Sequence, residues 1–562
     1  MRLGTSALAL TLSVALAVPA SAQGLAGSYL AARQANINSD YAASAQYYGQ
    51  AIARDPQNPG LLEAALTAFI NLGEHDKAVP IARQLLNNVS ESQIANLVLL
   101  VDAMAEGRYD ALLADLEGGM QVMPLINGLA KAWAEVGQGQ MSAALVSFDA
   151  IVAEEGLRSF GLYHKALALA SVGDFEGADV IFQGEETPLR LDRRGIEARL
   201  QILSQLERNA DALELMDAAF GNESDPALDE LRTMFEAGAP VPFTAVTSAK
   251  EGMAEVFFMV ASILSNEANP GYSLLFSRAA EHLNPNHVET ILLSAEFLDE
   301  LEQYELATKA YDSVPRSHPA FYSAELGRAE ALRRAGRTDT AVEVLEQLSE
   351  SHSNLAIVHN ALGDMLRQEQ DYAGAGKAYD RAIAQFEDPN QISWRLYYVR
   401  GIAREREDRW EEAEADFRRS LELRPDEPRV LNYLGYSLLE KQIKLDEALA
   451  MIEKAVEGSP DSGYIIDSLA WGLYRLERYE EAVPHIERAV ELMPLDPVVN
   501  DHVGDIYWAV GRKREAEFQW SRALSFDPEE EDAERIRKKL EVGLDKVLED
   551  EGADPLAIAN DG

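Results

Sequence analysis

Small and apolar positions recur along this chain at intervals close to 34 residues. The clearest copies lie between Leu431 and Pro528, where a small residue is followed twelve positions later by a proline. The three such pairs are Ala448 and Pro460, Ala482 and Pro494, and Ala516 and Pro528. Proline cannot donate a helical hydrogen bond and disfavours helix at the preceding residue, so each unit should end there. The spacing between prolines predicts a pair of helices in every unit.

The residue types at these positions indicate how the helices pack. Two helices approach closely only where the facing side chains are small, so Gly435, Gly504 and the recurring alanines mark contacts between neighbouring helices. Larger side chains then fill the gaps, as at Ile452 and Trp520. One helix pair cannot bury its own apolar face, whereas a stack of pairs buries it continuously. An all-helical repeat array is therefore predicted.

The same small position extends through the chain and predicts about 14 helix pairs. Its earlier occurrences are Ser44, Ala78, Leu112, Ala144, Ala178, Ala212, Ser273, Ala307, Ala341, Ala375 and Ala413. The interval is 61 residues between Ala212 and Ser273, where an extra helix (225–236) and a Pro- and Gly-containing segment (237–244) are expected. We interpret residues 223–247 as an irregular linker between two arrays, 23–222 and 248–528, which proteolysis should separate into folded halves. A polar capping helix is expected over 529–548, followed by a disordered acidic tail, 549–562.

The 34-residue period is that of the tetratricopeptide repeat, and the whole chain from residue 23 resembles that family. Gly363, Gly401, Trp410, Phe417 and Pro425 stand where its signature places them. The resemblance implies an all-α right-handed superhelix that binds other proteins through the first helix of each pair.

A narrower resemblance covers about 100 residues. The segments 432–436, 444–449 and 467–471 resemble a group of bacterial envelope repeat proteins, some of them lipoproteins that present substrates to carboxyl-terminal processing proteases. This resemblance implies a scaffold or adaptor that delivers cell-wall enzymes to such a protease. The chain departs from the lipoproteins because it contains no cysteine, so it cannot be lipidated.

The first 22 residues have the layout of a secretory signal peptide. A basic residue, Arg2, precedes an apolar run from Leu8 to Val18, and Ala20-Ser21-Ala22 forms a cleavage site before Gln23. No later stretch is long and apolar enough to cross a membrane. The expected mature protein is soluble and periplasmic.

Charge and motif content exclude several classes of function. The formal net charge of −44 repels phosphate backbones, so nucleic acid is not an expected partner. The absence of cysteine excludes disulfides and zinc-thiolate sites. No phosphate-binding glycine loop, His-Glu-x-x-His motif or nucleophile elbow occurs, and the nine histidines are scattered. We therefore predict neither an enzyme nor a cofactor or metal site, and leave the oligomeric state open.

The candidate binding residues are side chains of the first helices that do not belong to the packing signature. They are Tyr398, Asn432, Tyr436, Tyr464, Asp467, Trp471, Tyr474, Asp501, Asp505 and Trp508. Tyrosine and tryptophan beside hydrogen-bonding groups are typical of recognition surfaces, although these rings also suit packing between helices. Two alternatives stay open: a glycan-binding scaffold for polysaccharide export or cell-wall assembly, and a glycoside hydrolase using two of the aspartates.

The corresponding row in the N-terminal units is apolar. It consists of Leu97, Val101, Trp133, Phe160, Tyr163 and Leu167. Core packing and a groove for an apolar segment explain this row equally well. A clamp for a chain-end carboxylate is disfavoured, because Asn360 is followed one turn later by Asp364, whose charge is wrong for that ligand.

Overall fold

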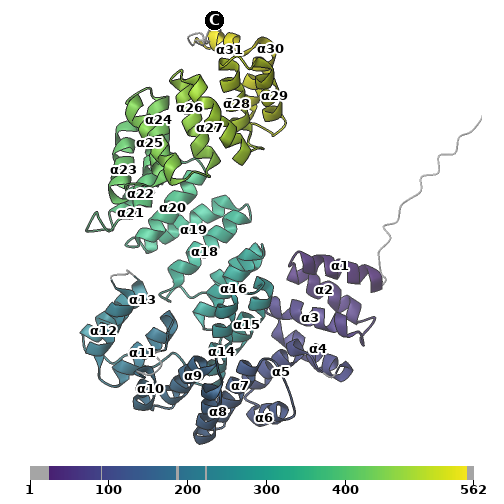
Figure 1. Ribbon diagram of the computed structural model, residues 1–562. Helices are drawn as coiled ribbons and strands as arrows, with labels where there is room; N and C mark the ends of the chain where they lie inside the picture. The colour runs from purple at the N-terminus through teal and green to yellow at the C-terminus, as the bar shows by residue number, and fades with distance from the viewer. Residues whose placement is uncertain (1–24, 90, 185–188, 222–224, 553–562) are drawn as a thin grey trace, which may run out of the picture. The chain divides into compact units, whose positions relative to one another are not determined.

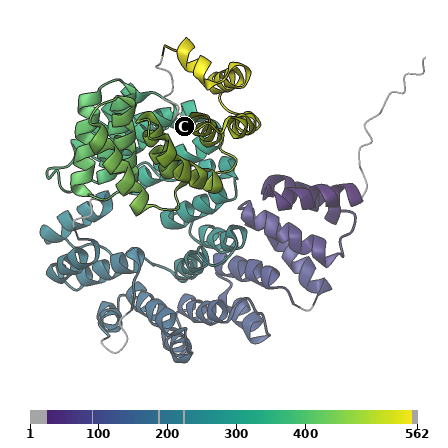
Figure 2. The ribbon, with the colours of Figure 1, turned by 45° about the horizontal axis from the view of Figure 1, so that its top comes forward.

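The computed structural model describes residues 25–552 except 90, 185–188 and 222–224, and in this part of the chain the only regular secondary structure is helical (Figure 1; Figure 2). The proposed signal peptide and the last ten residues of the acidic tail lie outside the described residues. The described chain forms two compact units, 1–344 and 345–562 by residue number, which divide within one helix. No described helix is long and apolar enough to cross a membrane.

Helices α1 to α19 begin and end as follows. They are α1 Leu25–Ile37, α2 Tyr41–Ile52, α3 Pro59–Asn71, α4 His75–Asn88, α5 Gln93–Ala105, α6 Tyr109–Glu117, α7 Pro124–Gly137, α8 Met141–Ala153, α9 Arg158–Ser171, α10 Phe175–Phe182, α11 Arg193–Gln205, α12 Asn209–Phe220, α13 Pro226–Glu236, α14 Ala249–Leu264, α15 Pro270–Leu283, α16 Val288–Glu300, α17 Tyr304–Asp312, α18 Phe321–Arg334 and α19 Thr338–Ser351.

The remaining helices belong to the second unit. They are α20 Ala356–Gln368, α21 Tyr372–Ile383, α22 Trp394–Arg406, α23 Trp410–Leu423, α24 Pro428–Glu440, α25 Leu445–Gly458, α26 Gly463–Arg475, α27 Tyr479–Leu492, α28 Pro497–Ala509, α29 Lys513–Leu524, α30 Glu530–Val542 and α31 Leu544–Asp550.

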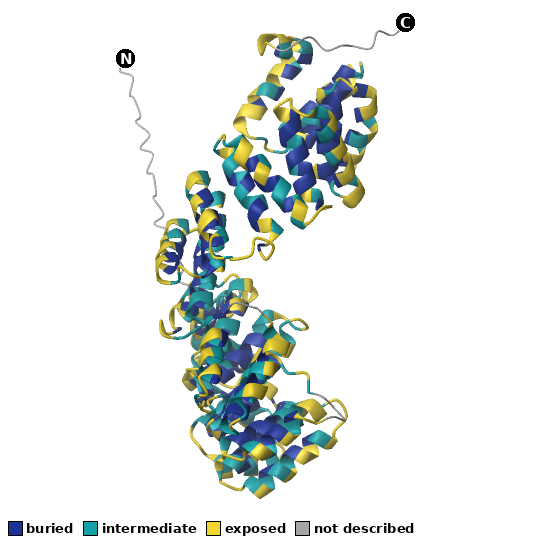
Figure 3. Ribbon diagram, turned by 90° about the vertical axis from the view of Figure 1, so that its left-hand side faces the viewer, coloured by how far each residue is buried: buried dark blue, intermediate teal, exposed yellow. Residues whose placement is uncertain are grey.

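The predicted helix pairs are confirmed. Helices α1–α12 make six pairs, α13 is the extra helix expected over 225–236, and α14–α29 make eight more. All fourteen small positions lie on the second helix of a pair, and each has an exposed fraction of 0%. Figure 3 shows the buried positions along the inward faces of the helices in each unit. Fourteen pairs therefore share one mode of contact.

Large side chains of the second helices occupy the space beside glycines. A Cβ added to Gly363 would lie 2.5 Å from the ring of Tyr379, and one added to Gly401 would lie 2.7 Å from Phe417. Each ring stands four residues after a buried alanine, one helical turn along the same face. Any larger residue at these glycines would push the two helices apart.

The chain departs from a simple stack at the 61-residue interval. After α13, helices α14 and α15 return to the first array, where α14 packs on α5, α7 and α9, and α15 packs on α3 and α5 (Figure 1). Gly252 makes this possible, because its Cα lies against the indole of Trp133 with no room for a side chain. Polar contacts add to the packing: Asn71 Nδ2 donates to the Gly271 carbonyl at 3.1 Å, and Arg278 Nε donates to the Asn71 carbonyl at 3.3 Å.

This return explains the apolar row of the N-terminal units. Leu97, Val101, Trp133 and Leu167 belong to one hydrophobic core together with residues of α14 and α15. The groove is thus filled by the protein's own chain. The segment 237–244, expected to separate two arrays, instead connects helices of a single compact unit, because the chain after it packs into the array before it.

The C-terminal cap also differs from its prediction. The expected helix over 529–548 is interrupted at Gly543, whose φ of +82° only glycine adopts readily. A Cβ at Gly543 would also lie 2.7 Å from the ring of Trp508. Two short helices, α30 and α31, therefore cover the end of the array.

Cleavage within 237–244 should leave the two fragments together. We expect a protease site inserted there to be cut while both fragments elute as one species in size-exclusion chromatography, because α14 and α15 are held in the groove of α3–α9. The same cleaved protein in urea is the control and should separate. Elution as two folded fragments in native buffer would restore the two-array interpretation.

The first unit should lose stability in mild acid. His75 and His282 stack with ring centroids 4.3 Å apart, and burial followed by the neighbouring imidazole lowers the pKa of His75 to about 4; burial also lowers the pKa of His282. The unfolded chain, with a histidine pKa of about 6.5, binds more protons than the folded chain below that pH. Each such histidine should therefore cost about 1.4 kcal/mol of unfolding free energy per pH unit between its unfolded and folded pKa values.

Urea unfolding at pH 7 and pH 5 measures this dependence. The double variant H75Q/H282Q should lose less stability on acidification than the unaltered protein, because glutamine does not titrate. His164, buried with a pKa near 4, contributes equally to both proteins and cancels in the comparison. Equal pH dependence of the two proteins would contradict the assignment.

Candidate partner-binding groove

The first helices of the last repeats in the second unit line two adjoining hollows. The larger, of about 550 Å³, lies over α24 and α26, and the smaller, of about 120 Å³, lies between α28 and α30. Val498 and His502 of α28 line both hollows and so join them. Four predicted residues line the larger hollow, namely Asn432, Tyr436, Tyr464 and Asp467, and two line the smaller, namely Trp471 and Asp501.

A stack of rings stands where the hollows meet. The indole of Trp471 lies between the ring of Tyr474, with centroids 4.8 Å apart, and the imidazole of His502, at 3.9 Å and nearly parallel. Its Nε1 donates to Glu440 Oε1 at 3.3 Å. Trp471 is half-buried, whereas Tyr474 is 8% exposed and serves as the inner layer of the stack. Trp471 therefore presents a fixed aromatic edge to the groove.

His502 is a site residue that the sequence reasoning missed. Its Nδ1 lies 3.0 Å from Asp467 Oδ1 and 3.1 Å from Oδ2. Burial alone would lower the pKa of His502, but the carboxylates of Asp467, Asp501 and Asp505 together outweigh burial and raise it. The sequence did contain a signal for His502. It is next to Asp501 on a helix predicted to bind a partner, at a position that faces Asp467 of the preceding repeat.

The tyrosines and Asn432 supply the remaining groove surface. Tyr464 is 46% exposed, and Tyr436 is half-buried, with its pKa raised to about 12 by burial and by nearby Glu440 and Asp467. Asn432 is 8% exposed, and its Oδ1 has no hydrogen-bond partner among the described residues. A phenol and an amide able to form new hydrogen bonds are thus present beside the aromatic rings.

Asp501 and Asp505 do not form the free acceptor row that the sequence suggested. Lys539 of α30 reaches both carboxylates, with Nζ–O distances of 2.7 to 2.8 Å, and Trp520 Nε1 donates to Asp505 at 2.9 Å. Lys539 and Asp505 are 1% exposed. Burial, followed by the charge of Asp505, raises the pKa of Asp501 to about 6. These aspartates fasten the cap to the array.

Trp508 and Tyr398 also pack against other side chains of the second unit. Trp508 is 8% exposed, and its Nε1 donates to Asp545 of α31 at 3.0 Å. Tyr398 is half-buried, with its ring centroid 6.1 Å from that of Phe417 and 5.9 Å from that of Tyr433. The reachable part of the predicted row therefore centres on Tyr436, Tyr464 and Trp471.

Replacing Lys539 with methionine should strongly destabilise the second unit. Two buried carboxylates would lose their counter-ion, and breaking a buried ion pair in this way costs about 3–5 kcal/mol. Urea unfolding measures the loss, and adding Asp505→Asn should recover part of it. Lys538→Met is the matched control: Lys538 pairs with Asp550 at the surface, where such a pair contributes about 1 kcal/mol or less. Equal effects of the two lysine variants would show that the buried triad does not hold the cap.

Comparisons with known proteins agree with the repeat architecture. A model of the tetratricopeptide repeat family matches residues 295–350, 326–391 and 398–463, the last of which ends at the start of α26. A TPR repeat-containing protein of Pseudomonas aeruginosa is 27% identical over 207 residues, which is 36% of this chain and 34% of that protein. The match thus spans about a third of the relative's length.

The solved structures that match are more distant in sequence. The Cut9–Hcn1 hetero-tetramer structure of the APC/C matches at 14% identity and a TM-score of 0.37 over 92% of this chain and 96% of that one. Yeast Tom70 matches at 15% identity and 0.35 over 95% and 98%, and a tetratricopeptide repeat protein of Parabacteroides merdae at 16% and 0.38 over 46% and 98%. The residues that match the family model are tetratricopeptide repeats, and the described residues hold fourteen helix pairs.

Proposed function

We propose that the groove of the second unit binds an extended segment of a partner protein, and that the chain is a non-catalytic scaffold. The observation that carries this proposal is the fixed aromatic edge of Trp471 at the junction of two hollows, within helices of the repeat type. Tetratricopeptide-repeat proteins bind other proteins, and interface hot spots are enriched in tryptophan and tyrosine. Val498, 47% exposed, and Tyr464 add apolar surface on either side.

Polar groups beside these rings suit the backbone of a bound segment. The unpartnered Oδ1 of Asn432 can accept a backbone N–H after a small rotation, which would satisfy a buried oxygen that is otherwise costly. Asp467 already has a partner in His502, whose Nδ1 lies 3.0 Å from its carboxylate, so the groove itself does not demand a strongly charged segment. The net charge of −44 on the whole chain favours encounter with a basic partner.

The compartment and the adaptor role rest on the sequence. The layout of residues 1–22 supports export to the periplasm, and the resemblance at 432–436, 444–449 and 467–471 supports an adaptor that presents cell-wall enzymes to a processing protease. A glycan-binding role in this groove is less favoured, because Lys539 engages Asp501 and Asp505, the carboxylates that would have received sugar hydroxyls.

Truncation of Trp471 tests the groove. We expect Trp471→Ala to weaken partner capture from envelope extract by roughly thirty-fold, since loss of a hot-spot ring costs about 2 kcal/mol or more. Helical content and urea midpoint should change little, because the indole is half-buried. Phe518→Ala is the matched aromatic control: Phe518 is 63% exposed on α29, outside both hollows, and its loss should not affect capture.

A second control separates binding from folding. Ala482→Trp overpacks a completely buried contact and should melt the second unit. If Trp471→Ala melts the unit in the same way, or if Phe518→Ala weakens capture equally, the groove is not the binding surface.

A further inference from the structure

The return of the chain into its own first array creates a cavity in the first unit. Its volume is about 590 Å³, within the range of sites that bind small molecules. Its walls come from the starts of five helices, α11, α13, α14, α16 and α18, which are far apart in sequence. The cavity lies in a different unit from the proposed partner groove and shares no residue with it.

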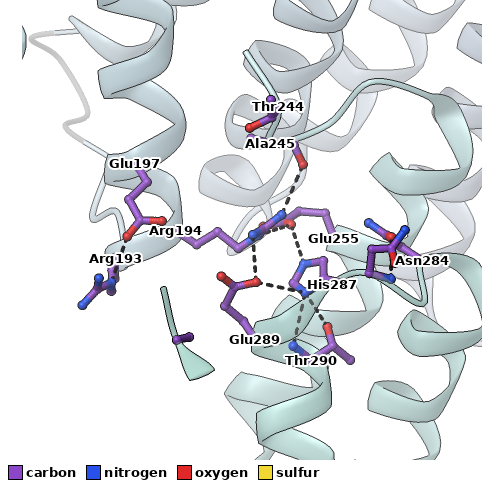
Figure 4. A network of polar contacts seen from close by, with 12 residues as sticks. Arg193, Arg194, Glu197, Thr244, Ala245, Glu255, Asn284, His287, Glu289 and Thr290 are labelled. Carbon is purple, nitrogen blue, oxygen red and sulfur yellow. Dashed lines mark hydrogen bonds and ion pairs between the residues drawn. The ribbon is translucent and has the colours of Figure 1, made fainter. Parts of the chain in front are cut away.

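A buried network of polar contacts forms one wall and fixes its shape (Figure 4). Arg194 of α11 donates through Nε to Glu255 at 2.6 Å, through NH1 to Glu289 at 3.1 Å and through NH2 to the Ala245 carbonyl at 3.2 Å. Glu255 also accepts from Tyr163 Oη at 3.0 Å. Because these contacts engage all three guanidinium nitrogens of Arg194, this cation is already neutralised by the protein.

His287 completes that wall with a defined tautomer. Its Nδ1 accepts from the backbone N–H of Thr290 at 3.2 Å and so caps α16. The proton therefore lies on Nε2, which is 3.3 Å from Glu255 and donates to it. His287, Glu255 and Thr290 are each no more than 3% exposed. Such a satisfied network holds its side chains in one arrangement before any ligand binds.

The carboxylates that face the cavity are matched as well. Arg193 pairs with Glu197 at 2.9 Å and with Asp225 at 3.0 Å. Asp225 also caps α13 through the N–H groups of Ala227 and Leu228, and Glu251 accepts the N–H and hydroxyl of Thr247 at 2.7 Å. The positive ends of five helices offset further negative charge. An anionic ligand would meet more carboxylates than arginines, and a cationic ligand would have to displace contacts that these carboxylates already make, which is costly.

The other polar groups around the cavity carry no charge. They are the hydroxyls of Thr244, Thr247, Tyr322 and Ser323, the amides of Gln201, Asn284 and Asn286, and the ring of His318. His318 Nδ1 accepts the Ala320 N–H at 3.2 Å, which leaves the proton on Nε2 as a donor. Amides and hydroxyls both donate and accept, as sugar hydroxyls do.

We propose that this cavity is a binding site for an uncharged, hydroxyl-rich ligand of the neutral saccharide class. Paired charges supply polar walls, while the neutral groups of the loop between α15 and α16 and of α18 offer hydrogen bonds to adjacent hydroxyls. The site stands on residues separate from those of the protein-binding groove. Its failure would therefore leave the proposed scaffold function untouched.

Isothermal titration of the full chain with four probes tests the proposal. At least one of the two neutral disaccharides, cellobiose or N,N′-diacetylchitobiose, should bind. The cation spermidine and the anion glucose 6-phosphate should not bind at this cavity. Asn286→Ala and Tyr322→Phe should each weaken saccharide binding about ten-fold, the effect of losing a hydrogen bond of roughly 1.4 kcal/mol. Asn266→Ala, at an exposed asparagine of the same unit outside the cavity, is the matched control and should bind normally.

Three outcomes would overturn the proposal. These are binding of neither neutral disaccharide, tighter binding of a charged probe that the cavity variants abolish, and saccharide binding that Asn286→Ala and Tyr322→Phe leave unchanged. Tyr322 Oη also donates to Asp225 at 3.4 Å, so circular dichroism of both variants is needed to keep the test independent of folding. Wild-type helical content together with weakened saccharide binding supports the site.

Discussion

Close contact between the two helices of each pair is the constraint on which the rest of the structure depends. Fourteen positions on the second helices are completely buried, and they hold alanine in eleven pairs, serine in two and leucine in one. Small side chains let the backbones approach, and large rings one turn later fill the space that the approach leaves, as Tyr379 does against Gly363. Because this contact is local, it recurs wherever the sequence repeats, and neighbouring pairs extend one core.

The first unit differs from a regular stack of helix pairs because part of its chain folds back onto the array. A solenoid normally leaves the surface of its first helices open, but here α14 and α15 occupy that surface. The apolar row from Leu97 to Leu167 then needs no external partner. The return also brings the starts of five helices to one place, where paired carboxylates and two arginines surround a cavity. The packing of α14 and α15 on the first array thus creates the polar cavity beside them.

In the second unit, the first helices α24 and α26 stay accessible, whereas α28 is covered by the C-terminal cap. Lys539 inserts a charge between Asp501 and Asp505, and α31 covers Trp508, so the last repeat contributes little open surface. The open part of the groove therefore consists mainly of side chains of α24 and α26, and His502 of α28 joins it to the smaller hollow. The predicted binding residues look alike in the sequence, but the C-terminal cap covers those of α28 and leaves those of α24 and α26 accessible.

The sequence by itself determined the helix pairs, their number and the close contacts, because these depend on residues within about 34 positions of one another. It also placed Tyr436, Tyr464 and Trp471 on the helices that line the groove. Tertiary structure decided which side chains meet: Gly252 packs against Trp133 far along the chain, and between neighbouring elements Lys539 pairs with Asp501 and Asp505, and His502 with Asp467. A repeat pattern records which face of a helix is buried or polar, but it does not record which distant segment meets that face. The physical reason is that the sequence shows whether a side chain is apolar or polar, and hence whether it is expected to be buried. Which other segment buries it depends on the path of the whole chain.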